Sequence, residues 1–398
     1  MKGSPIILLS TLLSCASGLE LHKRHNPAVV QVDFEKRTKD FFPGHGKRDI
    51  ANMKVGLRDY LYWANFTLGN PPQELSAVID TGSSDLVLLT NEIENCEKGR
   101  CRGGVFNTEK LEDSKTKYRN LPYALAVAGA INTPAYSMWL EDDITGQFLF
   151  GGVNKAKYKE PLVTYPIPVN NESNKRDRAL AVMTGFATTY NEESSELDFE
   201  PRLVLLDSGT PKSRLTLDMT MHLINTMNVS YYEKHGPAAP CEGSSRNTLD
   251  FTFSELTISV PLSNFLWETS FVSDGLAYCK IRYDATATHI ILGDDFLKGA
   301  YVVFDFANME ISLAARNPED AEDDIHEIVR EVPGASAATG VPGKYLGFDQ
   351  PALSNPMAVP SGIPTVNENF LSTATEGGSE GFGYMLLFAL ILYVVAHA

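Results

Sequence analysis

The sequence has few basic residues for its length. Its 34 Lys and Arg residues stand against 50 Asp and Glu residues, which gives a formal net charge of −16. Proteins bind phosphate backbones with clustered basic side chains, so nucleic acid is not expected as a partner. Only 21% of the residues are charged and 43% are hydrophobic. This composition excludes wholesale disorder and predicts a folded core.

The motifs of metal, serine-hydrolase and nucleotide chemistry are absent too. The 8 His residues include no His-Glu-x-x-His pair, and no other ligand spacing predicts a catalytic zinc. Gly82-Ser83-Ser84 lacks the second glycine of a nucleophile elbow, and no P-loop or dinucleotide-binding fingerprint occurs. We therefore expect neither a metal nor a cofactor.

The first 48 residues resemble sequence that is removed from a secreted protein. Residues 1–18 combine a basic start, an apolar run and small residues, the pattern of a signal peptide. The alternative is a bacterial lipoprotein signal ending at Cys15. Residues 19–48 contain three dibasic pairs: Lys23-Arg24, Lys36-Arg37 and Lys47-Arg48. We interpret them as processing sites in a basic propeptide that covers an acidic body, as in a zymogen, although ordinary solvated charge is the alternative.

The other end of the chain has a different composition. Residues 316–376 begin with an acidic run and continue with many Pro, Gly, Ala and Ser residues, which predicts a flexible stalk. Residues 377–398 end in an apolar tail, residues 384–398. As a helix this tail would rise only about 22 Å, against a hydrocarbon core of roughly 30 Å. A small, polar spacer before such a tail predicts a GPI-attachment signal, with attachment between Ser372 and Gly378. The alternative is a tail-anchored or buried helix.

Between these ends the sequence predicts a mainly β body. Short apolar runs alternate with Gly, Pro, Asn and Asp, the pattern of short strands. Three sequons begin at Asn65, Asn171 and Asn228 and predict N-glycosylation of a secreted protein. Of the 5 cysteines, one lies in the leader, and the rest allow two disulfides. The cysteines outside the leader are Cys96, Cys101, Cys241 and Cys279.

Two segments of the body share one plan, an apolar strand followed by Asp, a hydroxyl residue, Gly and a second hydroxyl residue. They are Val78-Ile79-Asp80-Thr81-Gly82-Ser83 and Leu205-Leu206-Asp207-Ser208-Gly209-Thr210. Each strand would carry its Asp into an apolar interior, and Gly82 or Gly209 would permit the turn that follows. The repetition predicts an internal duplication whose halves face each other. The alternative is a pair of Asp residues that cap turns.

Such a pair has a defined chemistry. Two carboxylates in contact cannot both ionise, so Asp80 and Asp207 would share one proton. The ionised member can deprotonate a water while the protonated member hydrogen-bonds the scissile carbonyl. The second hydroxyl residue of each plan, Ser83 or Thr210, can orient its carboxylate. The pattern therefore predicts a peptide-bond hydrolase that needs no metal.

With these motifs the sequence resembles the pepsin-like aspartic proteases, and within them the fungal GPI-anchored yapsins and the candidapepsins. The resemblance covers residues 55 to about 315 with one gap. Besides the two Asp segments it is carried by Gly69-Asn70-Pro71-Pro72-Gln73, Asn120-Leu121-Pro122-Tyr123-Ala124-Leu125, Ser137-Met138-Trp139-Leu140, Leu149-Phe150-Gly151-Gly152-Val153 and Ile290-Ile291-Leu292-Gly293-Asp294.

The resemblance implies a bilobal, mainly β fold with an active-site cleft between an N-terminal lobe, residues 49–165, and a C-terminal lobe, residues 166–315. It implies a catalytic Asp80 and Asp207, endopeptidase activity at acidic pH, and the disulfides Cys96–Cys101 and Cys241–Cys279. We expect a secreted monomer, GPI-anchored at the plasma membrane or cell wall. Its partners would be its own propeptide and polypeptide substrates. Acidic residues such as Glu92 favour cleavage near basic residues, if they are more than solvated loop charge.

The first lobe departs from the family pattern. Gly293 ends an apolar-apolar-Gly segment after Asp207, and the duplication requires a counterpart after Asp80. Tyr118 already belongs to a later block, so a stretch between Cys101 and Tyr118 is missing. That stretch should contain the flap with its Tyr. Either an exon has been omitted from an active protease, or the chain is a catalytically impaired surface protein that keeps the scaffold.

Overall fold

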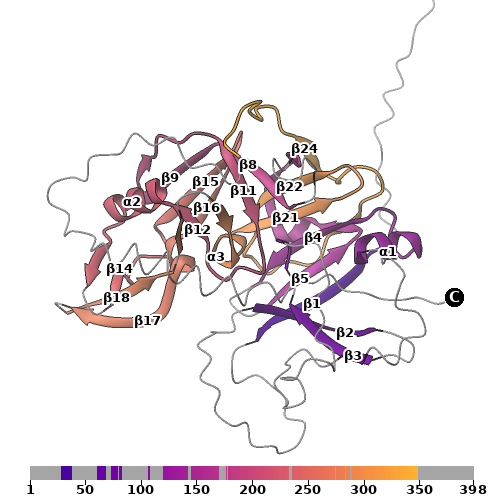
Figure 1. Ribbon diagram of the computed structural model, residues 1–398, viewed down its shortest axis with the longest axis horizontal. Helices are drawn as coiled ribbons and strands as arrows, with labels where there is room; N and C mark the ends of the chain where they lie inside the picture. Colours follow the sequence, from indigo (N-terminus) through magenta and orange to yellow (C-terminus); the bar gives the residue numbers. More distant parts are fainter. Residues whose placement is uncertain are drawn as a thin grey trace, which may run out of the picture.

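Strands make up most of the described part of the chain, and they form two lobes side by side in the computed structural model (Figure 1). The mainly β, bilobal fold predicted from the sequence is confirmed. The structure describes residues 28–37, 61–68, 73–78, 80–82, 106–107, 120–141, 145–169, 176, 178–232, 235–273, 275–282, 284–286 and 289–347.

Within these ranges a nine-stranded sheet joins strands from both ends of the chain, in the order β24-β7-β22-β21-β4-β5-β1-β2-β3. Its strands are β1 (Val30–Arg37), β2 (Leu61–Leu68), β3 (Gln73–Val78), β4 (Ala135–Leu140), β5 (Thr145–Phe150), β7 (Tyr158–Pro166), β21 (Ala300–Asp305), β22 (Glu310–Arg316) and β24 (Ala335–Ala337). We refer to it as the central sheet. Neighbouring strands are antiparallel except β24 and β7, which are parallel.

The central sheet is covered on both faces. All six residues of β4 are buried, and successive side chains of a strand point to opposite faces. On one face Trp139 stacks on Tyr301, with ring centroids 5.6 Å apart. On the other face Tyr136 packs against Phe148 and Phe304, at 5.2 and 5.0 Å. The two groups belong to separate hydrophobic clusters, so the sheet divides two cores.

Three further sheets, counted over the described residues, build the C-terminal lobe. One has the order β10-β9-β15-β16, from β10 (Glu193–Glu196), β9 (Gly185–Tyr190), β15 (Thr248–Phe253) and β16 (Leu256–Pro261). The next has the order β19-β12-β20-β11-β8, from β19 (Asp284–Thr286), β12 (Arg214–Thr216), β20 (Ile290–Leu292), β11 (Arg202–Leu206) and β8 (Leu180–Met183). The last has the order β13-β14-β18-β17, from β13 (Ser230–Tyr232), β14 (Gly236–Pro240), β18 (Leu276–Ile281) and β17 (Leu266–Ser273).

The helices of the described residues are short. They are α1 (Leu121–Val127), α2 (Leu217–Thr226), α3 (Asp294–Leu297) and the 3₁₀ helices η2 (Lys155–Lys157) and η3 (Leu262–Phe265). The side chain of Asn120 caps α1 by accepting a hydrogen bond from Tyr123 N, and Pro122 suits the first turn because it has no N–H to leave unpaired. No helix in the described ranges has the length and hydrophobicity to cross a membrane.

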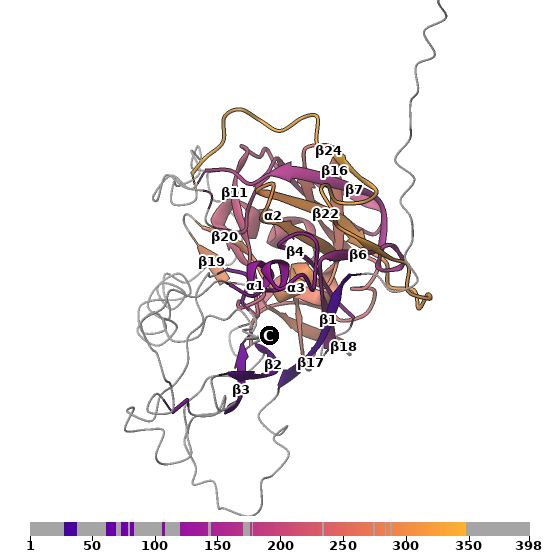
Figure 2. The same ribbon diagram turned by 90° about the vertical axis from the view of Figure 1, so that its right-hand side faces the viewer.

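β1 lies inside the segment that the sequence predicts to be a propeptide, residues 19–48. Val30 to Glu35 pair with β5, and Glu35 to Arg37 pair with β2, both antiparallel. Figure 2 shows β1 extending from the body of the molecule toward β2 and β3. Among the described strands, β1 is therefore the one through which the β2–β3 hairpin joins the rest of the central sheet.

The structure differs from the predicted stalk over residues 317–347. β23 (Ile325–Glu327) pairs with β6 (Gly152–Asn154), and β24 extends the central sheet. Ile328 and Val332 are buried in a core cluster. The abundance of small and polar residues suggested disorder. Composition alone does not reveal that a few apolar residues are buried or that the main chain pairs with strands of the body. The rest of the predicted stalk and the predicted GPI signal lie outside the described residues.

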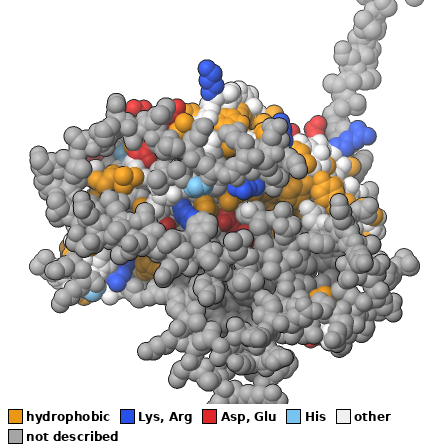
Figure 3. Space-filling view, in the orientation of Figure 1, with side chains coloured by type: hydrophobic (Ala, Val, Ile, Leu, Met, Phe, Trp, Pro, Cys, Tyr) orange, Lys and Arg blue, Asp and Glu red, His pale blue; other side chains and the backbone are white. Residues whose placement is uncertain are grey.

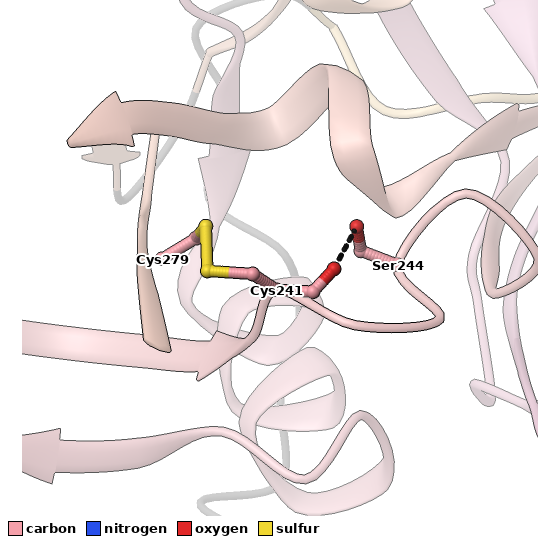
Figure 4. Close-up of a disulfide and its surroundings, with 3 residues drawn as sticks. All are labelled: Cys241, Ser244 and Cys279. Carbon is pink, nitrogen blue, oxygen red and sulfur yellow. Dashed lines mark hydrogen bonds between the residues drawn. A yellow bond between two sulfur atoms is a disulfide. The ribbon is translucent and has the colours of Figure 1, made fainter. Parts of the chain in front are cut away.

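The structure contains the disulfide Cys241–Cys279, with Cα atoms 5.1 Å apart (Figure 4). It links the end of β14 to β18, and Ser244 Oγ donates to Cys241 O at 2.8 Å in the turn that follows. Ser83, Cys96, Cys101 and Asn171 lie outside the described residues.

Of the predicted glycosylation sites, Asn65 lies in β2. Asn228 is exposed in the turn after α2, where its φ is 51°. An asparagine in an exposed turn is accessible to modification. On the face shown in Figure 3, basic and acidic side chains are interspersed among the described residues.

Candidate active site

Each of the two predicted catalytic residues follows a strand and starts a tight turn. Asp80 comes after β3, whose Val78 is buried, and Gly82 N donates to Asp80 Oδ1 at 2.8 Å. Asp207 comes after β11, all of whose residues are buried, and Gly209 N donates to Asp207 Oδ1 at 2.8 Å. The two turns thus repeat one geometry, as the repeated sequence plan predicted.

The hydroxyl residue after each Asp ties the two turns together. Thr81 Oγ1 donates to Leu206 O at 2.8 Å and accepts from Ser208 N at 2.9 Å. Ser208 Oγ accepts from Thr81 N at 3.1 Å. These three bonds lock two segments far apart in the sequence, so the positions of the two carboxylates are set by main-chain and hydroxyl contacts. The sequence placed Thr81 and Ser208 in the pattern without assigning this role.

The glycines let the two carboxylates meet. A Cβ atom built on Gly82 would lie 2.6 Å from Asp207 Cγ. A Cβ built on Gly209 would lie 2.6 Å from Asp80 Cγ and 3.1 Å from Asp207 Oδ1. Because one point beside Gly209 is this close to both side chains, Asp80 and Asp207 flank the same small volume. The structure brings together the pair that the sequence predicted.

Thr210 supports Asp207 as the pattern predicted. Its Oγ1 donates to Asp207 Oδ2 at 2.6 Å, and both side chains are buried. With Gly209 N on Oδ1, each oxygen of this carboxylate accepts a hydrogen bond, which favours a fixed orientation.

A second segment, residues 292–296, holds the Asp207 turn from behind. Asp207 N donates to Leu292 O and Asp294 N donates to Thr210 O, each at 3.0 Å. A Cβ atom on Gly293 would overlap Thr210 O, so only glycine permits this approach. The apolar-apolar-Gly segment therefore supports the turn that starts at Asp207.

Two buried carboxyl groups follow Gly293. Asp294 pairs with Arg282 at 3.3 Å and with Lys298 at 3.7 Å. Asp295 accepts from Ser213 N and Ser213 Oγ, and from Phe296 N at 2.9 Å. Burial raises the pKa of Asp295 to about 6, against the opposing effect of the Ser213 hydrogen bonds. Sequence reasoning did not single out Asp295, because its burial depends on how β12 and β20 pack.

A sequence model of the eukaryotic aspartyl protease family matches residues 102–316, more than half of the 398 residues. The chain belongs to this family. The matched range contains Asp207 and begins after Asp80.

Named fungal proteases are similar to this aspartyl protease. It is 28% identical to the probable aspartic-type endopeptidase opsB of Aspergillus fumigatus over 460 aligned positions, covering 89% of this chain and 94% of the relative. It is 27% identical to candidapepsin-4 of Candida albicans over 68% of this chain and 79% of that protein. It is 34% identical to yapsin-3 of Saccharomyces cerevisiae over 57% of this chain and 46% of that protein. The resemblance predicted from the motifs is confirmed.

The alignment with the Aspergillus relative is longer than this chain. It has 460 positions against 398 residues, so it sets residues of the relative opposite gaps in this aspartyl protease. A segment missing from the first lobe would produce such gaps. Most residues between Cys101 and Tyr118 lie outside the described ranges. Among those described, Phe106 is buried, and the main chain of Asn107 exchanges hydrogen bonds of 2.8 and 3.1 Å with the Gln73 side chain.

Tyr136 of this aspartyl protease is a buried phenol that the charge of Asp80 influences. Its ring packs among Phe148, Phe150 and Phe304, with centroids 5.0 to 5.6 Å away. Burial and, to a smaller extent, the negative charge of Asp80 raise the pKa of Tyr136. The phenol therefore stays protonated at acidic and neutral pH. Among the described residues no His, Cys, Asp and Glu side chains form a group that could hold a metal ion.

Proposed function

We propose that this aspartyl protease is a secreted, cell-surface endopeptidase that hydrolyses peptide bonds at acidic pH with a water activated by Asp80 and Asp207. One observation carries the proposal. Thr81 and Ser208 exchange hydrogen bonds across the two turns, and the carboxylates of Asp80 and Asp207 flank one point beside Gly209. Two carboxyl groups that close are suited to sharing a proton.

The proposed mechanism uses only these two side chains and water. The pair holds one proton, which belongs to the dyad rather than to either residue. Its ionised member takes a proton from a water, while the protonated member donates to the scissile carbonyl oxygen. The resulting hydroxide adds to the carbonyl carbon, and a proton passes to the leaving amine as the C–N bond breaks. Hydrogen bonds from Gly82 N, Gly209 N and Thr210 Oγ1 keep the carboxylates oriented through these steps.

Several features support a secreted zymogen. The predicted signal peptide, dibasic pairs, sequons and GPI signal agree with one route to the cell surface. The names of two relatives, secreted aspartic protease 4 and secreted aspartic protease 7, fit secretion. β1 packs into the central sheet as a propeptide strand would, and cleavage after Lys47-Arg48 would separate it from the body. We expect polypeptide substrates cut near basic residues.

Peptide cleavage by the purified, processed chain tests the proposal. A peptide mixture would be incubated between pH 3 and 7, and the products read by mass spectrometry. We expect cleavage that is strongest at acidic pH and that falls by roughly 10²- to 10⁴-fold in Asp207→Asn. The exposed-residue variant Asp320→Asn is the matched control and should keep full activity. Equal activity in both variants would assign the cleavage to a contaminant.

The second candidate is a catalytically impaired surface protein that keeps the protease scaffold. The long alignment with the Aspergillus relative favours it, since a shortened first lobe would lack the flap that covers a bound peptide. Sequencing the native transcript across the codons for Cys101 to Tyr118 separates the two. A longer message encoding a Tyr-containing segment supports the active protease. A message that matches the present sequence, together with no cleavage, supports the scaffold.

A further inference from the structure

The chain continues past the end of the family match at residue 316 as a folded segment. We call residues 317–347 the strap, and Figures 1 and 2 show its last part crossing the top of the molecule from β24 toward β11. Its first anchor is on the segment that directly follows β5 of the central sheet. β23 pairs with β6, and Ile328 N donates to Gly151 O at 2.8 Å. Ile328 is fully buried, whereas the next residue, Val329, is 54% exposed.

The second anchor crosses from one lobe to the other. β24 lies parallel to β7 at the edge of the central sheet, and Ala338 N donates to Thr164 O at 2.8 Å. The next residue, Thr339, donates its N–H to Glu255 Oε1 at 2.9 Å. Glu255 belongs to the turn between β15 and β16 of the C-terminal lobe, and this donor lowers the pKa of its carboxyl. Two successive residues of the strap thus bind different lobes.

The third anchor is the strand that leads to Asp207. Leu346 O accepts from Leu203 N at 3.0 Å, and Leu346 N donates to Pro201 O at 2.8 Å. At Arg202, β11 already pairs with β8 on one side, while β20 pairs with β11 only from Val204 onward. Leu346 therefore occupies the edge of β11 that β20 leaves open, in a parallel bridge to Arg202.

From these three anchors we propose that the strap is a positioning element, which holds β11, and through it Asp207, in place against the central sheet. The catalytic consequence rests on the proposed function, but the structural one does not. Asp207 directly follows β11, so a shift of β11 moves its carboxylate relative to Asp80. Small displacements of reacting groups strongly reduce catalysis.

The sharpest test compares Leu346→Pro with Leu346→Ala in the full chain. Both remove the side chain, but only proline also removes the N–H that Pro201 O accepts. Hydrogen exchange of the peptide covering residues 201–207 would be followed by mass spectrometry. We expect exchange at least tenfold faster in Leu346→Pro than in Leu346→Ala, with other β-sheet peptides unchanged. Equal exchange in the two variants would overturn the proposal.

A second pair of variants tests the first anchor. Ile328→Ala empties a buried site, whereas Val329→Ala trims an exposed neighbour. We expect Ile328→Ala to lower the unfolding temperature by about 5 to 10 °C and Val329→Ala to leave it nearly unchanged. Equal unfolding temperatures would contradict a strap that is part of the folded body.

Peptide cleavage connects the strap to catalysis. Leu346→Pro should lower kcat at least tenfold relative to Leu346→Ala with KM nearly constant, because binding surfaces remain while Asp207 moves. If exchange changes as expected but neither variant nor the unmodified chain cleaves peptides, the proposed function fails and the strap stands. If cleavage is normal in both variants while exchange differs, the strap does not position Asp207.

Discussion

At the scale of single residues, Gly209 makes room for the partner carboxylate. An added Cβ would lie 2.6 Å from Asp80 Cγ, closer than real Cβ contacts. We predict that Gly209→Ala separates the two carboxylates and lowers kcat/KM for peptide cleavage by roughly 100-fold. Gly343→Ala is the control, because nothing lies within 4 Å of its added Cβ. Unchanged kcat/KM in Gly209→Ala would show that the two carboxylates need not meet.

The sequence predicted the pair at this scale because repetition is visible in one dimension. Asp80 and Asp207 stand in the same plan of residue types, which also predicted that Thr210 orients Asp207. The plan assigned Gly82 and Gly209 only to the turns, and not to the room that they leave for the partner carboxylate. The bonds between Thr81 and Ser208 were not predicted, because they depend on how two distant turns face each other. The buried environment of Asp295 was not predicted for the same reason.

At the scale of elements, β1 has a position that composition does not reveal. Its dibasic pair Lys36-Arg37 was interpreted as a processing site, with solvated charge as the alternative, and in the structure both residues pair with β2. A strand pairs with its neighbours through main-chain N–H and C=O groups, which residues have whatever their side chains, except that proline lacks the N–H. For the strap, too, main-chain pairing overrides a composition rich in Pro, Gly, Ala and Ser. Strand patterns in the body, by contrast, were predicted well because their apolar residues form the two cores.

We predict that Glu35→Pro lowers the stability of the unprocessed chain. Glu35 is paired with Trp63 of β2 and with Thr145 of β5, so a proline there removes an N–H from a ladder wherever it points. The free energy of unfolding should fall by at least about 1 to 3 kcal/mol, measured by urea denaturation of the unprocessed chain. Glu35→Ala keeps the N–H and is the control. After processing at Lys47-Arg48, neither substitution should alter the mature protein.

At the scale of the whole molecule, charge favours an acidic environment. The net charge at neutral pH is −16, so the excess carboxylates repel one another. Protonation of carboxylates relieves this repulsion as the pH falls. Asp295 adds an effect of the same sign. Burial raises its pKa from 3.8 to about 6 in the folded state. The stability that its neutral form contributes is therefore fully present below about pH 4 and is lost as the pH rises through 6.

The groups that face Asp295 fix how this prediction is tested. Ser213 donates to its carboxyl, Arg282 favours the ionised form and Asp294 disfavours it. Asp295→Asn keeps an acceptor for Ser213 and cannot ionise. A shift of this size corresponds to on the order of 3 kcal/mol at about 1.4 kcal/mol per pKa unit. We expect urea denaturation at pH 4 and pH 7 to show a difference in unfolding free energy that is smaller in Asp295→Asn by this amount.

The exposed-residue variant Asp320→Asn separates the effect of this one buried group from that of net charge, since it removes the same charge from the surface. Its stability should follow that of the unmodified chain at both pH values. Curves that run parallel for all three proteins would mean that Asp295 is ionised throughout this range. In that case self-repulsion alone would set the pH dependence, and high salt should remove most of it because salt screens surface charge. A dependence on Asp295 should persist in high salt, because a buried group is screened much less.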